Sequence, residues 1–211
     1  MGRALPIDVH ALQPGDILAC WGGDLLSRVV SLGTCWPVGP TSLWLPPSHV
    51  AVICDYRDQP CWVESTTLCR HSCLVSGKPI EGVQAHLPEL RIDDYLEHGG
   101  RVELYRLSPI DSLSSAESDL LTRILFRYLV GRVRYDKRRA ALSGSKVFWL
   151  MQSCLPRSSR EEMFCSQLIA RLLMRLNRLN RANPAWYNPG RLLRRVCWDG
   201  TYERVGVVDG V

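Results

Sequence analysis

The sequence predicts an α+β fold in which a small antiparallel sheet comes first in the chain and long helices follow. Short strand-like runs dominate up to Leu107, and after Pro109 the apolar residues follow helical spacing. The 211 residues, of which 46% are hydrophobic and 22% charged, have the length and composition of one ordinary globular domain with a substantial core. We therefore expect residues 1–211 to form a single domain.

Five segments are expected to supply the strands of the sheet. They comprise residues 17–20 after the Pro14-Gly15 turn, 48–54, 60–67, 82–85 and 101–107. Tyr56 to Gln59 is expected to form a hairpin turn, so the second and third strands should be antiparallel neighbours. Short helices are expected at residues 24–32 and 91–98, and segment 33–47, which is rich in Trp and Pro, is expected to be a surface loop.

Two long helices are expected in the second half of the chain. The first follows the capping-box pattern Ser114-x-x-Glu117, and its apolar residues recur three and four positions apart until Gly131. The second is expected at residues 161–179, where apolar residues recur at the same spacing, and Asn183-Pro184 would stop it.

The net charge of +5 is concentrated in two segments, 123–139 and 171–195, which hold most of the arginine excess. Arg-rich helices can contact phosphate, anionic lipid or an acidic polymer, but they are also common as solvated faces. We expect no obligatory nucleic-acid partner, and we expect any contact with an anionic surface to be made by the Arg-rich C-terminal helices.

Residues 1–12 contain no apolar stretch of signal-peptide length, and no window approaches the ~18 uninterrupted apolar residues of a membrane span. We therefore expect a cytoplasmic protein. The nine cysteines are scattered singly and are odd in number, which argues against a disulfide framework in that compartment.

Four potential zinc ligands, Cys61, Cys69, His71 and Cys73, fall close together in the chain. A structural zinc site usually has a tight two-ligand knuckle that is repeated about a dozen residues later, whereas these four lie in one short stretch. We therefore expect no metal and no other cofactor.

Cys165 lies near the beginning of the second long helix and is the best candidate for a nucleophile. A helix N-terminus carries a positive partial charge and unpaired backbone N–H groups, which favour the thiolate and can stabilise the oxyanion of an acyl-transfer intermediate. The alternative interpretation is that Cys165, between Phe164 and Leu168, is a small core residue.

His49 opens an apolar strand directly after a loop, so its imidazole can face a cleft and accept a thiol proton. Glu64 lies on the neighbouring predicted strand, where a carboxylate would be costly to bury without a partner. If the hairpin brings Glu64 beside His49, the carboxylate can orient the imidazole by a hydrogen bond. The alternative interpretation of His49 is a structural histidine whose hydrogen bonds are satisfied.

Several short motifs, in this order along the chain, resemble a known family. They are Leu12-x-x-Gly15-Asp16-Ile17, Ser48-His49-Val50-Ala51-Val52, Val63-Glu64-Ser65, Gly82-Val83, Gly131 followed by Tyr135-Asp136, and Phe164-Cys165-Ser166-Gln167-Leu168. The chain resembles the circularly permuted NlpC-type papain-like cysteine hydrolases, in the YiiX/YebB-like branch, where the His-bearing strand precedes the Cys-bearing helix. The resemblance implies a small half-barrel sheet packed against that helix and a Cys–His–polar triad, which maps onto Cys165, His49 and, as the polar member, Glu64 or another polar group.

The resemblance also implies hydrolysis of an amide or related acyl bond through an acyl-enzyme, without a metal or cofactor. The substrate would be a small peptide, a peptidoglycan fragment or a lipid-like acyl compound. One alternative is transfer of the acyl group to an acceptor, as in the related lecithin–retinol acyltransferase-like proteins. The other is a non-catalytic basic module that binds nucleic acid or anionic lipid, in which Cys165 would be buried and inert.

Overall fold

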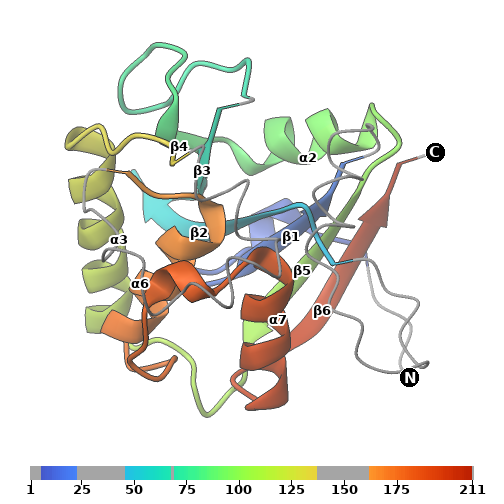
Figure 1. Cartoon of the computed structure of the whole chain (residues 1–211). Coiled ribbons are helices and arrows are strands. Elements are labelled where there is room, and N and C mark those ends of the chain that lie inside the picture. The colour runs from blue at the N-terminus through green and yellow to red at the C-terminus, as the bar shows by residue number, and fades with distance from the viewer. Residues whose placement is uncertain (1–5, 23–45, 68, 137–161, 211) are drawn as a thin grey trace.

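A computed structural model describes residues 6–22, 46–67, 69–136 and 162–210, which form a six-stranded antiparallel open sheet packed against helices (Figure 1). The strands are β1 (Ile17–Trp21), β2 (His49–Tyr56), β3 (Gln59–Thr66), β4 (Gly82–His86), β5 (Arg101–Leu107) and β6 (Tyr202–Asp209), in the spatial order β4-β3-β2-β1-β5-β6. The helices are α2 (Pro88–Leu96), α3 (Ser115–Val130), α6 (Cys165–Arg175) and α7 (Pro189–Trp198), with short 3₁₀ helices η1 (Val9–Ala11) and η2 (Pro184–Trp186). The predicted mixture of antiparallel sheet and separate helices is confirmed.

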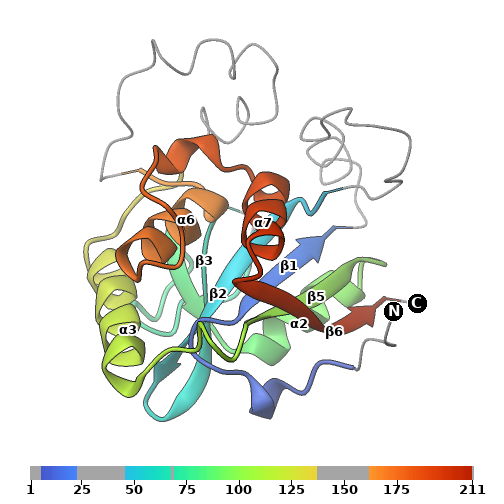
Figure 2. The ribbon, with the colours of Figure 1, turned by 90° about the horizontal axis from the view of Figure 1, so that it is seen from below.

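Helices cover both faces of the sheet. Successive residues of a strand point to opposite faces, so Ile17 and Ala19 of β1 join one hydrophobic cluster while Leu18 and Cys20 join another. The first cluster lies under α3, α6 and α7, and the second lies under α2 (Figure 2). The central strands of the sheet are therefore buried on both faces, and a polar side chain on them needs a partner inside the protein.

The hairpin of β2 and β3 has the turn that the sequence predicts. Arg57 and Asp58 both have positive φ, 53° and 60°, as the central residues of a two-residue type I′ turn require. Tyr56 pairs with Gln59, and the pairing continues to Val52 and Val63. This turn fixes the register that carries His49 and Glu64.

Gly82 begins β4 at a point where another part of the backbone comes very close. Its φ is +112°, and a Cβ atom built on it would lie 2.1 Å from the carbonyl oxygen of Val133. Only glycine fits there, and Val83 N–H then donates a hydrogen bond to the same carbonyl at 2.9 Å. The Gly82-Val83 motif therefore joins β4 to the segment that follows α3.

Helix α3 matches its prediction at both ends. The Ser114 side chain accepts a hydrogen bond from the Glu117 N–H, the Glu117 carboxylate accepts one from the Ser114 N–H, and Gly131 caps the C-terminus. Helix α7 likewise begins where Asn188 caps it, with the Asn188 side chain accepting a hydrogen bond from Arg191 N–H at 2.8 Å.

The second long helix is shorter than the predicted range 161–179. Glu162 forms a parallel β-bridge with Arg134, which keeps the chain extended up to the helix start at Cys165. At the other end Asn177 has a left-handed φ of 56°, which ends the helix before Asn183-Pro184 is reached. Cys165 is therefore the first residue of α6.

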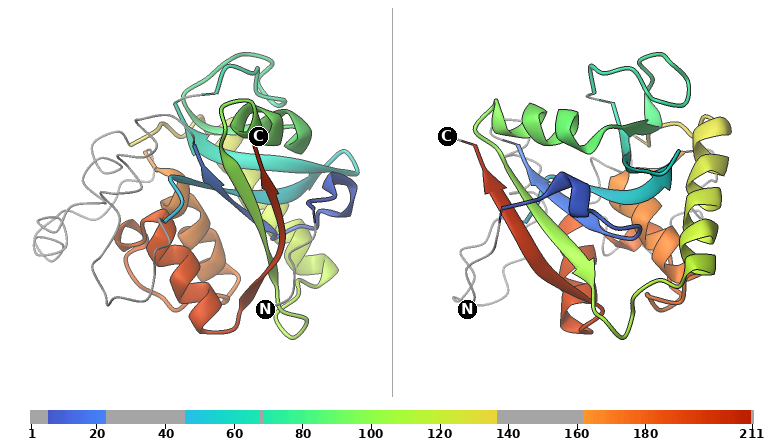
Figure 3. Two further views of the ribbon diagram at one scale, coloured as in Figure 1. Left: turned by 90° about the vertical axis from the view of Figure 1, so that its right-hand side faces the viewer. Right: turned by 180° about the vertical axis from the view of Figure 1, so that it is seen from behind.

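Two further elements differ from the prediction. Helix α2 starts at Pro88, three residues before the predicted 91–98, because proline is well suited to the first turn of a helix. The strand β6 was not predicted, and it returns the chain to the sheet beside β5 after all the helices (Figure 3). The expectation that the sheet lies wholly in the first half of the chain is therefore wrong.

The predicted helix 24–32 lies outside the described residues, as does most of the predicted loop 33–47. In the described part of the chain, no helix has the length and apolar character needed to cross a membrane.

Candidate active site

The start of α6 is held against the sheet by hydrogen bonds to Met163, two residues before Cys165. The Ser65 hydroxyl of β3 donates to the Met163 carbonyl at 2.6 Å, and the Met163 N–H donates to the Arg134 carbonyl at 2.9 Å. Met163 and Phe164 are themselves fully buried. The position of the Cys165 sulfur is therefore set by β3 and by the segment after α3 together.

His49 is the first residue of β2, and the residue before it ties β2 to β1. The Ser48 N–H and hydroxyl both donate to the Cys20 carbonyl, at 2.9 Å and 3.1 Å. His49 then pairs with Cys20 in the ladder and is only 9% exposed. These two hydrogen bonds fix the backbone position from which the His49 side chain extends.

Glu64 of β3 holds the His49 ring. Its Oε2 lies 2.7 Å from His49 Nε2, and the Glu64 side chain is completely buried. Because Nε2 is committed to the carboxylate, Nδ1 is the ring nitrogen left for Cys165, which is close enough for the two groups to shift each other's pKa. The structure thus brings together Cys165, His49 and Glu64, the three residues predicted from the sequence.

The electrostatics of this group favour a charged pair. Burial opposes ionisation of Cys165, but His49 and the backbone N–H groups of Val50 and Ser166 lower the pKa of its thiol below the ordinary value. Burial alone would lower the pKa of His49, but the Cys165 thiolate and the Glu64 carboxylate raise it to about 10. Each of the two groups therefore favours the charged form of the other, the thiolate of Cys165 and the imidazolium of His49.

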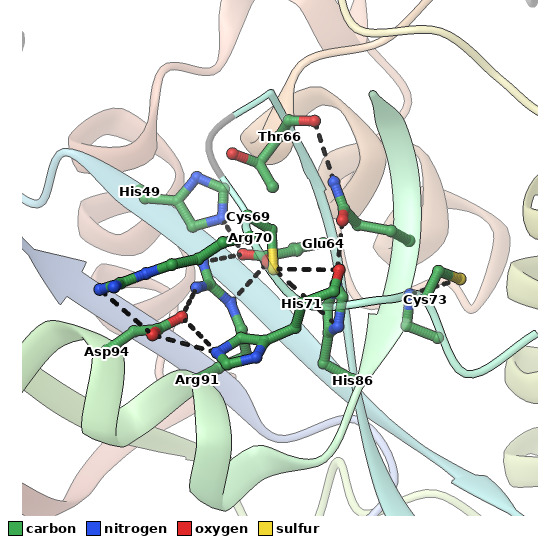
Figure 4. A network of polar contacts seen from close by, with 12 residues as sticks. His49, Glu64, Thr66, Cys69, Arg70, His71, Cys73, His86, Arg91 and Asp94 are labelled. Carbon is green, nitrogen blue, oxygen red and sulfur yellow. Dashed lines mark hydrogen bonds and ion pairs between the residues drawn. The ribbon is translucent and has the colours of Figure 1, made fainter. Parts of the chain in front are cut away.

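Arg91 of α2 supports the carboxylate from the opposite side and was missed by the sequence analysis (Figure 4). Its Nε donates to Glu64 Oε1 at 2.8 Å, and its Nη2 lies 3.4 Å from Glu64 Oε2. Burial favours the neutral acid, but Arg91 and His49 hold the pKa of Glu64 well below its ordinary value. Glu64 is therefore a carboxylate shared between two cations.

The same network extends from Arg91 to the surface. Arg91 Nη1 is paired with Asp94 one turn later on α2, and Asp94 Oδ1 lies 3.1 Å from His71 Nε2 (Figure 4). The three-residue spacing of Arg91 and Asp94 could have suggested an ion pair within the predicted helix. It could not have shown that the pair points at Glu64, because that depends on how α2 packs on β3.

The four potential zinc ligands of the sequence do not form one site. Cys61 and Cys73 lie in the hydrophobic cluster under α3, α6 and α7, and His71 contacts Asp94. Cys69 lies instead beside His86 of β4, with 3.9 Å between its Sγ and His86 Nδ1.

Within the described ranges seven cysteines are present and all are free thiols. They are Cys20, Cys54, Cys61, Cys69, Cys73, Cys165 and Cys197. The remaining two, Cys35 and Cys154, lie outside those ranges.

Part of the C-terminal arginine excess is used inside the fold. Arg178 donates to the carbonyl of Asp111 at 2.8 Å and pairs with Glu117 at 3.1 Å, so it ties the end of α6 to the start of α3. Arg195 pairs with Asp199 at 2.8 Å. These arginines have structural partners, so the charge excess of the segment overstates what is free to meet an anionic surface.

No protein-family model matches this chain, and no curated protein matches it in sequence.

Proposed function

We propose that this protein is a thiol hydrolase of the circularly permuted NlpC-type papain-like group, in the YiiX/YebB-like branch. The observation that carries the proposal is the arrangement at the start of α6, where Glu64 holds the buried His49 ring and His49 and the buried Cys165 shift each other's pKa. A buried cysteine that served only as core would need neither a histidine beside its sulfur nor a carboxylate behind that histidine.

The order of the elements also supports the papain-like assignment. The strand that carries His49 comes early in the chain, and the helix that carries Cys165 comes late and packs on β2 and β3. This is the permuted order that the sequence motifs suggest.

The first step of the proposed reaction is acylation of Cys165. The thiolate attacks the substrate carbonyl and a C–S bond forms, while the His49 proton passes to the leaving amine or alkoxide as its bond to carbon breaks. The oxyanion would lie at the start of α6, where the first backbone N–H groups of a helix have no helical acceptor. Glu64 keeps the imidazole oriented throughout.

The second step releases the acyl group. His49, now neutral, takes a proton from water, and the water oxygen attacks the thioester carbonyl. The C–S bond breaks, the carboxylic acid leaves, and thiolate and imidazolium are restored. We propose a small peptide, a peptidoglycan fragment or a lipid-like acyl compound as substrate and a cytoplasmic location for the reaction.

The proposal is tested by labelling each cysteine with iodoacetamide from about pH 4 to about pH 9 and reading the products by mass spectrometry. We expect Cys165 to react well below the ordinary thiol pKa of ~8.5, and His49→Ala to move that reaction to alkaline pH. Cys197 is the internal control, because it is exposed but burial of its sulfur raises its pKa to about 11.

A Cys165 that is as slow as the core cysteines and indifferent to His49 would contradict the proposal. Where Cys165 does react selectively, incubation with candidate esters and amides should give an acyl adduct on Cys165 that Cys165→Ala lacks. Transfer of that acyl group to an added amine or alcohol faster than to water would identify an acyltransferase instead of a hydrolase.

A further inference from the structure

A second cysteine–histidine pair lies beside Glu64. Cys69 follows β3 and His86 ends β4, and together with Glu64 they place a sulfur, a ring nitrogen and a carboxylate oxygen within 4.8 Å of one another (Figure 4). In a tetrahedral zinc site, where the bonds to such atoms are about 2.0–2.3 Å long, neighbouring ligand atoms lie closer together than 4.8 Å. Glu64 and His86 come from two paired strands, which fix their positions, and Cys69 comes from the loop after β3.

The hydrogen bonds of Gln84 fix the orientation of the His86 ring. Gln84 Nε2 donates to the carbonyls of Thr66 and Ile80, both at 3.1 Å, so the side-chain nitrogen is fully used. Gln84 Oε1, 3.0 Å from His86 Nε2, must then accept the Nε2–H hydrogen bond. The lone pair of His86 is therefore on Nδ1, which faces the Cys69 sulfur.

This is the arrangement that histidine ligands of metals commonly have. The nitrogen away from the metal donates to an oxygen, which sets the tautomer and leaves the other nitrogen ready to bind. Burial, reinforced by Arg91 against the opposing charge of Glu64, lowers the pKa of His86 to about 4, so the ring is neutral under ordinary conditions. Cys69 is 9% exposed, whereas His86 and Glu64 are almost completely buried.

We propose that Cys69, His86 and Glu64 bind Zn²⁺ or another thiophilic divalent cation. Binding releases the Cys69 thiol proton to solvent, and the thiolate, the neutral imidazole and the carboxylate then supply three ligands, with a fourth position left for water. The charged groups that face this site are Glu64, Asp94, His71 and Arg91. Arg91 repels a cation, so the site binds reversibly and does not serve as a structural zinc site.

The shared carboxylate gives the site a route to Cys165. A cation bound to Glu64 makes that carboxylate a weaker hydrogen-bond acceptor for His49 and loosens the orientation of the ring. This regulatory consequence rests on the proposed hydrolase function, whereas the metal site itself does not.

The metal site is tested with Co²⁺ as the probe, in full-length protein that carries Cys165→Ala so that the candidate nucleophile cannot bind the ion. We expect a thiolate-to-cobalt charge-transfer band that Zn²⁺ abolishes by competition. The band should disappear in Cys165→Ala/Cys69→Ser and persist in the matched control Cys165→Ala/Cys197→Ser. Gln84→Ala, which frees the His86 tautomer, should weaken Co²⁺ binding about 10- to 100-fold.

Circular dichroism and thermal unfolding establish that each variant is folded, and His86→Gln in the same background provides a second ligand substitution. A band that survives Cys69→Ser, or that is missing in the Cys165→Ala protein, overturns the metal site. The regulatory link is tested separately in protein that retains Cys165. Zn²⁺ should slow iodoacetamide labelling of Cys165, and Cys69→Ser should remove that slowing; equal slowing in both proteins would mean that Zn²⁺ acts at Cys165 directly.

Discussion

The two cysteine–histidine pairs that flank Glu64 look alike in composition but differ in charge. At the start of α6, the pKa of Cys165 is lowered and that of His49 is raised to about 10, and both shifts favour the charged forms. Beside β4, burial raises the pKa of Cys69 and lowers that of His86 to about 4, which gives a neutral pair. Proximity of a thiol to an imidazole therefore does not by itself make a nucleophile.

The group behind each imidazole explains most of this difference. His49 is backed by the Glu64 carboxylate, whose negative charge stabilises an imidazolium, and His86 is backed by the neutral amide oxygen of Gln84. Cys165 also has backbone N–H donors at the helix start, which stabilise a thiolate. This difference is what the two proposals use, nucleophilic chemistry for the first pair and metal binding for the second.

The largest effect is expected from Glu64→Gln, which gives His49 a neutral amide partner like that of His86 and so removes the main difference between the two pairs. We expect the proposed hydrolysis to fall about 10⁴-fold, because an amide does not stabilise the imidazolium and can select the wrong tautomer. Iodoacetamide labelling of Cys165 at about pH 6 should fall by about two orders of magnitude as the thiol pKa returns toward ~8.5. Labelling that stays within about threefold of the wild-type rate would show that the carboxylate is not needed.

The second largest effect is expected from Arg91→Met, which removes the buried cation that holds Glu64. Breaking one partner of a buried ion pair leaves an uncompensated charge and costs about 3–5 kcal/mol of unfolding free energy. Urea unfolding at neutral pH measures this loss. Combining Arg91→Met with Glu64→Gln should restore part of the lost stability, because residue 64 is then neutral and needs no cation. If the double variant loses as much unfolding free energy as the two single variants together, the pairing of Arg91 with Glu64 is contradicted.

The low pKa of Glu64 predicts a loss of stability in acid. A carboxyl group whose folded-state pKa is depressed contributes stability above its unfolded value of about 4.3 and loses it as the pH falls toward the folded value. Urea midpoints measured from neutral to acidic pH should therefore fall less steeply in Glu64→Gln than in the wild type. Parallel pH profiles for the two proteins would show that Glu64 ionises no more easily in the folded state than in the unfolded state.

Local signals made part of the fold predictable. The β2–β3 turn and the capping box of α3 are each encoded within a few neighbouring residues, and both ends of these elements follow the prediction. Strand β6 was missed because its alternation is weak, with Gly206 in its middle and a register shift opposite Leu104 and Tyr105.

The candidate site was predictable only where short motifs carry it. Cys165, His49 and Glu64 each belong to a motif that can be recognised in the sequence. Arg91 and the Cys69–His86 pair could not be found in the same way, because their roles arise when α2 and β4 pack beside β3. Likewise the start of α6 at Cys165 depends on the pairing of Glu162 with Arg134, which no local pattern indicates.

The smallest effect is expected from removing a hydrogen bond to the backbone beside Cys165, since this changes the position of the sulfur and not the charges around it. Ser65→Ala removes the 2.6 Å hydrogen bond to the Met163 carbonyl that holds the start of α6. We expect a loss of about 1 kcal/mol in unfolding free energy and about a tenfold fall in Cys165 labelling, because the sulfur then moves relative to His49. Ser112→Ala is the matched control, since the Ser112 hydroxyl donates to the Pro109 carbonyl at 2.9 Å on an exposed turn. If both serine variants leave labelling unchanged, the position of the nucleophile is set by the packing of Met163 and Phe164, without help from this hydrogen bond.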